Sequence, residues 1–176
     1  MPEAPHLGYV QVVSEAGAFR GALLVVDCRG IPLDFRYTDP VSPTKLERVL
    51  YGDALEVYIQ EDVILGSLLG AVEEKPDLWI CQDRHLLAPL GHRAKKLSIV
   101  METTSRTPLE KAGATTPLPE ENVYLVQTDL MGPPCRVTTL KSGELERVSP
   151  ILVDAASTME LLEPFVRITK ALDVLD

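Results

Sequence analysis

Histidine and cysteine are scarce in this chain, which has three of each among 176 residues. The cysteines, Cys28, Cys81 and Cys135, are odd in number and far apart in the sequence. Secreted domains with a disulfide framework carry an even number, so the sequence predicts reduced thiols in a reducing compartment. The first residues, MPEAPH, also lack the basic and then apolar order of a secretory signal. We therefore expect a cytoplasmic protein.

Long apolar runs are missing as well. The longest, such as residues 22–26, are far shorter than the ~20 residues that a helix needs to cross a bilayer. The sequence therefore predicts no membrane-spanning helix and no membrane partner.

Positive charge is in deficit. The 17 Lys and Arg residues face 26 Asp and Glu residues, which gives a formal net charge of −9 and a pI near 4.8. Non-specific binding to nucleic acid depends on surplus cations, so this acidic composition argues against a nucleic-acid partner. The small cluster of Arg93, Lys95 and Lys96 would be the first place to test for such contact.

The common catalytic signatures are absent too. The sequence has no phosphate-binding GxxxxGK[ST] loop, no dinucleotide-binding GxGxxG, no nucleophile elbow GxSxG and no zinc-binding HExxH. No cofactor is expected. An enzyme would need a site that matches none of these motifs, so the interpretation leans away from catalysis.

What the sequence does contain is ample apolar material, 45% of residues, for a single α+β domain over residues 1–176. We expect a mixed, mostly antiparallel sheet of about six to eight strands. Strands are predicted first at 7–13, 21–27 and 31–37, and later at 77–82, 97–101, 122–127 and 135–141. A long helix near 43–71, starting at Ser42-Pro43, and a C-terminal helix near 157–175 cover this sheet.

Three segments are predicted to be irregular or extended. Residues 84–91 (RHLLAPLG) are interpreted as a single helical turn or a loop before the strand at 97–101. Residues 103–122 are rich in Thr, Pro and Gly and lack periodicity, which predicts a mobile loop. Residues 145–153 are interpreted as extended.

The first candidate site is the corner where the third strand meets the long helix. Arg36, Tyr37, Lys45, Arg48 and Tyr51 fall within 16 residues there. The cations and a helix N-terminus could bind an anion, or the Arg and Tyr side chains could form a protein interface. A third interpretation makes the corner structural, with Arg36 paired to a nearby carboxylate such as Asp34.

A weaker ligand site is predicted at Asp83, Arg84 and His85, because they directly follow a strand and ligand sites concentrate at the carboxyl ends of strands. Cys81 and His92 flank these residues, but their spacing matches no zinc pattern, so no metal is expected.

Together these patterns favour a non-catalytic interaction or assembly subunit of a cytoplasmic complex, with self-association or a protein partner expected. The alternative is a small-ligand binding protein or an enzyme, with an anion at the 36–51 corner or at residues 83–85.

Overall fold

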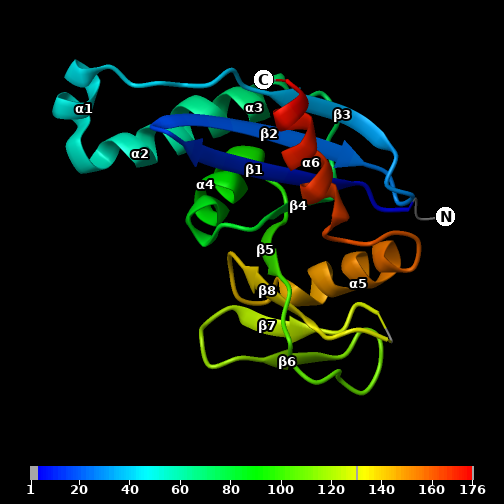
Figure 1. The fold of residues 1–176 in the computed structure, drawn as a ribbon. Helices are drawn as coiled ribbons and strands as arrows, with labels where there is room; N and C mark the ends of the chain where they lie inside the picture. The colour runs from blue at the N-terminus through cyan, green and yellow to red at the C-terminus, as the bar shows by residue number, and fades with distance from the viewer. Residues whose placement is uncertain (1–3, 130, 176) are drawn as a thin grey trace.

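A computed structural model describes residues 4–129 and 131–175. Its centre is one sheet of eight strands in the order β3-β2-β1-β4-β5-β8-β7-β6 (Figure 1). The strands are β1 (Leu7–Glu15), β2 (Ala18–Val26), β3 (Pro32–Tyr37), β4 (Leu78–Cys81), β5 (Ser98–Glu102), β6 (Thr115–Pro117), β7 (Val123–Val126) and β8 (Cys135–Thr139).

The pairing of these strands is mostly antiparallel, as the sequence predicted. Only β1 with β4 and β4 with β5 run parallel among the strand pairs of the described residues. The α+β class and the strand number are confirmed. The two parallel pairs bring the carboxyl ends of β1, β4 and β5 to one edge of the sheet, because parallel strands point the same way.

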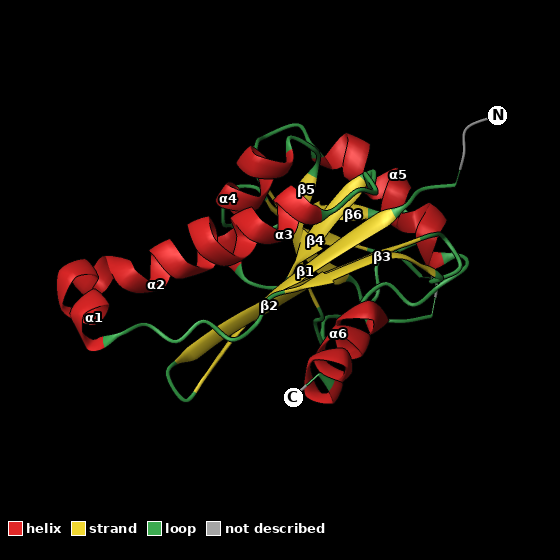
Figure 2. Cartoon of the chain, turned by 90° about the horizontal axis from the view of Figure 1, so that it is seen from above, coloured by secondary structure: helices red, strands yellow, loops and turns green. Residues whose placement is uncertain are grey.

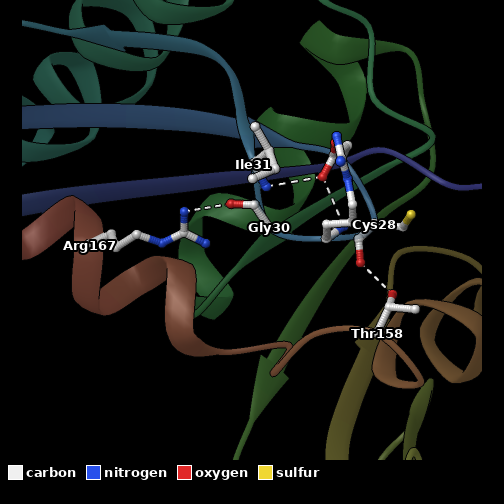
Figure 3. A network of polar contacts seen from close by, with 7 residues as sticks. Cys28, Gly30, Ile31, Thr158 and Arg167 are labelled. Carbon is white, nitrogen blue, oxygen red and sulfur yellow. Dashed lines mark hydrogen bonds and ion pairs between the residues drawn. The ribbon is translucent and has the colours of Figure 1, made fainter.

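The turn between β2 and β3 is fixed from inside and from outside. Inside it, one carboxylate oxygen of Asp27 accepts hydrogen bonds from the N–H groups of Arg29 and Ile31, at 2.8 and 3.0 Å. Outside it, Thr158 donates to the carbonyl of Cys28, and Arg167 donates to that of Gly30 at 2.7 Å (Figure 3). The C-terminal segments that contain Thr158 and Arg167 are therefore hydrogen-bonded to the β2–β3 turn.

The long helix is interrupted rather than uniform. It consists of α1 (Lys45–Tyr51), the 3-10 helix η1 (Gly52–Ala54), α2 (Leu55–Val57), the π-helix η2 (Tyr58–Leu65) and α3 (Gly66–Ala71). Its cap is a capping box, in which the Thr44 hydroxyl accepts from the Glu47 N–H at 3.1 Å and the Glu47 carboxylate accepts from the Thr44 N–H at 3.0 Å. The helix thus starts two residues after the predicted Ser42-Pro43.

Helices cover both faces of the sheet. Figure 2 shows α6 (Glu163–Val174) on one side of the strands, and α2, α3 and α4 (Arg84–Ala94) on the other. Leu55, Ile64 and Leu68 bury the helical arm against one face, whereas Phe165 and Ile168 of α6 pack on the opposite face. The helix α1 contributes no buried residue, so the predicted cover comes from residue 55 onward.

Two predicted segments differ from the structure, since both are helices. Residues 84–94 form α4, because Leu86, Leu87 and Leu90 are buried at helical spacing against the sheet. Residues 145–156 form α5 (Leu145–Ala156), in which Val148 and Leu152 are buried in the same way. In each case the apolar spacing outweighs an internal proline.

The C-terminal helix and the 103–122 segment also have different bounds from those predicted. The helix α6 begins at Glu163, and Pro164 lies in its first turn, where proline needs no N–H partner. Within 103–122, residues 115–117 form β6 and pair with β7. The mobility of this segment stays a prediction. No helix of the described residues is long and apolar enough to span a membrane.

Candidate nucleic-acid interface

A hollow lies at the carboxyl end of the parallel strand β4, beside the middle of β1. It has a volume of about 450 Å³ and is lined by residues 10–12 of β1 and by residues 82–86, which lead from β4 into α4. This is the part of an α/β-type sheet where ligands usually bind, because loops leaving neighbouring parallel strands meet there. We call it the strand-end hollow. It contains the predicted residues Asp83, Arg84 and His85.

Asp83 is the N-cap of α4. Its carboxylate accepts a hydrogen bond from the N–H of His85 at 2.9 Å, which satisfies one of the free N–H groups of the first turn. The backbone N–H, not the imidazole ring, is the donor. Asp83 therefore orients the start of the helix, and the exposed His85 side chain stands beside the hollow.

Arg84 lies between two glutamates from distant parts of the chain. Its guanidinium donates to the Glu120 carboxylate at 2.7 Å and lies 3.7 Å from the carboxylate of Glu102, at the end of β5. The hydrogen bond with Glu120 raises the pKa of Arg84, so the guanidinium stays charged. One oxygen of Glu102 is buried without a hydrogen-bond partner among the described residues. Exposed ion pairs contribute at most ~1 kcal/mol to stability. Arg84 can therefore exchange the exposed Glu120 carboxylate for another anion.

The strand behind the hollow ends in a buried thiol. Burial raises the pKa of Cys81 to about 12, and its Sγ lies 3.5 Å from the carbonyl oxygen of Asp83. A neutral thiol of this kind packs as a small apolar side chain. Across residues 4–129 and 131–175, no three or more His, Cys, Asp or Glu side chains come together as a group that could hold a metal ion.

Sequence reasoning missed the carboxylates around Arg84 and the residue Gln11, which lines the hollow from β1. Gln11 is also within 3.4 Å of the Thr169 hydroxyl of α6. Among these missed residues, only Glu102 had a signal in the sequence, because it lies at the end of a strand. The contact between Arg84 and Glu120, 36 residues apart, follows from the sheet order and has no local signal.

At the 36–51 corner, the structure separates the residues that the sequence grouped. Arg36 donates to Asp34 at 2.8 Å and lies 3.8 Å from Glu73. Arg48 instead donates to the carbonyl of Gly17 in the β1–β2 turn, at 3.1 Å. Lys45 is exposed on α1.

The two tyrosines of the corner make separate ring contacts. Tyr37 stacks on Phe35 with ring centroids 5.8 Å apart, and Tyr51 stacks on Tyr58 at 4.7 Å. The geometry pairs Arg36 with Asp34, as the structural interpretation expected. Binding of an anion or a protein at this corner stays a prediction.

Positive charge gathers instead along α4. Residues 84–96 (RHLLAPLGHRAKK) contain no Asp or Glu in a chain that has 26 of them. Their polar side chains are all exposed to solvent, and they are Arg84, His85, His92, Arg93, Lys95 and Lys96. The segment begins at the strand-end hollow and carries the predicted basic cluster at its far end.

Comparison with known proteins finds no matching family model and no matching curated protein. Solved structures with the same fold do exist. The chain is similar to endonuclease V from Streptomyces avermitilis, with a TM-score of 0.61 and 15% identity over 99% of this chain and 85% of that one. It is also similar to Ciona intestinalis endonuclease V (D234N), solved with a 23mer DNA containing an inosine followed by a ribo-adenosine, with a TM-score of 0.56 and 12% identity over 98% and 87%.

A third similar structure is endonuclease V from Bacillus subtilis, with a TM-score of 0.52 and 14% identity over 86% of this chain and 70% of that one. At these identities the likeness shows the fold alone, which this chain shares with the three endonuclease V structures.

The functional prediction from sequence was therefore wrong in two respects. The interpretation as a non-catalytic interaction or assembly subunit, with a protein partner or self-association, is overturned by the endonuclease V fold. The argument against a nucleic-acid partner fails as well, since one protein of this fold was solved with DNA. The physical reason is that a net charge of −9 is an average over the molecule and says nothing of a carboxylate-free segment such as 84–96.

Proposed function

We propose that this protein is a nucleic-acid-processing enzyme whose substrate strand lies in the strand-end hollow. The observation that carries the proposal is the coincidence of the endonuclease V fold with a hollow at the carboxyl end of β4, beside β1. In that hollow Arg84 supplies a cation for a phosphate, and His85 supplies an imidazole. Imidazole is the side chain that exchanges protons most readily near neutral pH, as phosphodiester hydrolysis requires.

The contacts of Arg84 support a role in binding phosphate. A guanidinium binds phosphate in two parallel hydrogen bonds, which a lysine cannot reproduce. In the free protein Glu120 occupies one side of this guanidinium, and the Glu120 side chain is 65% exposed. A phosphate can therefore displace Glu120 into solvent without leaving a buried charge unpaired.

Fluorescence anisotropy and strand cleavage test the proposal. The substrates are labelled single-stranded DNA, RNA, duplex DNA and a DNA with an inosine followed by a ribo-adenosine. Wild-type protein is expected to bind at least one of them and to shorten it. Arg84→Lys should weaken binding about tenfold, because it keeps the charge and loses the paired hydrogen bonds. His85→Ala should lower the cleavage rate by about 10²-fold or more and leave binding nearly unchanged.

Lys170→Ala is the matched control. Lys170 is exposed on α6, which packs on the opposite face of the sheet from α4. The variant should bind and cleave like wild type. Absence of binding to all four substrates would refute the proposal, and binding without any cleavage would reduce it to a nucleic-acid-binding role.

A cytoplasmic location belongs to the same proposal. All three cysteines are free thiols, as in a reducing compartment. Fractionation of the native cells with antibody detection would test the location.

A further inference from the structure

The second end of α4 carries a group of cations from separate parts of the chain. Beyond the helix, Lys95 and Lys96 line a hollow of about 310 Å³ together with Lys75 and Arg93. They also line an adjoining hollow of about 450 Å³, which contains Lys141 and Arg147. The carboxylates of these two hollows are Glu74 in the first and Asp77 and Glu144 in the second. Three of the cations are a visible cluster in the sequence, and the fold adds the other three. We call the two hollows with their six cations the lysine end of α4.

The lysines at this end differ from the arginines in their ion pairs. Arg93 pairs with Asp62, and Arg147 lies 3.9 Å from Glu144. By contrast, no ion pair within 4 Å among the described residues involves any of the four lysines, 75, 95, 96 and 141. Exposed and unpaired, they remain available to an anionic ligand.

Lys95 occupies a backbone position that glycine would fit with less strain. It is the C-cap of α4 in the left-handed conformation, with φ 55° and ψ 38°. Glycine is the usual residue there, because a Cβ is strained in that region. Cations near a helix C-terminus do complement the helix dipole. That effect does not require lysine at the strained position, and it does not account for Lys75 or Lys141, which come from outside α4.

The length of α4 corresponds to a few nucleotides of a nucleic-acid strand. The 11 residues of α4 give an axis of about 16 Å. Phosphates of one strand follow each other at about 3.4 Å per nucleotide along a helix axis, so this length corresponds to about five nucleotides. The segment between the two ends has no carboxylate of its own, and the carboxylates that border it, Glu61 and Asp62, come from η2, where Asp62 pairs with Arg93.

We propose that the exposed face of α4 is a phosphate-binding track for about five nucleotides, running from the strand-end hollow to the lysine end. This inference rests on the proposed function and adds a second contact region to it. The track holds the sugar-phosphate backbone and reads no base, because lysines contact phosphates as point charges.

The test compares Lys95→Gly with three control variants by fluorescence anisotropy on labelled single-stranded and duplex 12-mers between 25 and 200 mM KCl, roughly the range in which phosphate contacts change most with salt. Loss of one phosphate contact should weaken binding about five- to eightfold at ~0.1 M salt and lower the slope of log K against log salt by ~0.7 to 0.9. The melting temperature of the variant should stay unchanged or rise by up to about 4 °C, because glycine relieves the left-handed strain.

The controls separate charge from backbone. Ala16→Gly relieves a similar positive φ, 53°, in the β1–β2 turn without changing charge, and should bind like wild type. Lys170→Ala removes a lysine from the opposite face and should also bind like wild type. Lys95→Arg keeps the cation and should retain most of the affinity.

Each outcome decides between the two proposals. Wild-type binding that Lys95→Gly leaves unchanged in affinity and salt slope would overturn the track while the proposed function stands. An equal loss in Lys170→Ala would also overturn it, because the effect would then belong to net charge. No binding of wild type to any oligonucleotide would refute the proposed function and the track together.

Discussion

The buried amide of Gln127 holds two loops, and its removal should destabilise the protein measurably. The side chain is 1% exposed. Its oxygen accepts from the N–H of Leu109 at 2.8 Å, and its nitrogen donates to the carbonyls of Asp129 and Gly132. Gln127→Leu keeps the approximate size and removes all three hydrogen bonds.

The expected loss follows from counting those bonds. At ~1 kcal/mol of net stability for each, the variant should lose about 3 kcal/mol of unfolding free energy. For a chain of this size that corresponds to a melting temperature lower by about 6 to 12 °C. The N–H of Leu109 should also exchange with solvent faster, because it loses its acceptor.

Urea unfolding and amide hydrogen exchange measure both effects. Gln60→Leu is the matched control: the Gln60 side chain lies in η2 and is partly exposed, and the substitution should change stability by less than ~0.5 kcal/mol. A Gln127→Leu variant within that same margin, with slow exchange retained at Leu109, would refute the reasoning. The same hydrogen-exchange measurement would test the predicted mobility of residues 103–122.

Two further perturbations test the packing of the sheet and the charge of its edge. Gly8→Ala should lower stability by about 1 to 3 kcal/mol in urea unfolding, because a Cβ there would lie 2.5 Å from Trp79 Cε3 and 2.7 Å from Pro76 Cγ. Gly70→Ala, with nothing within 4 Å, should be neutral or stabilising, and equal stability of the two variants would contradict the close approach. Burial acts to raise the pKa of Asp34, but hydrogen bonds from the N–H groups of Glu73 and Glu74 and from Arg36 outweigh it and lower the pKa overall. The ionised carboxylate therefore adds stability above its unfolded pKa, near 3.9, which is lost as the pH falls through the lower folded value. Asp34→Asn should be less stable than wild type at pH 7 and closer to it at pH 2.5, and a constant difference in urea unfolding would argue against this linkage.

Much of the local structure was predictable because local patterns encode it. The unbroken apolar run of β2 indicated a strand buried on both faces, and Leu24 and Val25 are indeed at most 5% exposed. The full lengths of α4 and α5, which contain Pro89 and Pro150, were missed. In both, the decisive signal was already present as apolar residues at helical spacing.

The candidate site was predictable only in part. Asp83, Arg84 and His85 could be placed after a strand, and the cluster at residues 93–96 could be seen in the sequence. The spatial relation between these two groups could not be predicted, because it depends on α4, the helix that connects them. Without that helix, net charge was the remaining guide, and it pointed away from nucleic acid.

The sequence by itself determined the α+β class, the first three strands and the helix that covers the sheet from residue 55, since each follows from periodicity or composition. Only the tertiary structure decided which distant residues meet. The order β4-β5-β8-β7-β6 brings Glu120, between β6 and β7, to Arg84, and it brings Lys75 and Lys141 to the end of α4. A strand order depends on the packing of the whole sheet, and no single stretch of sequence records it.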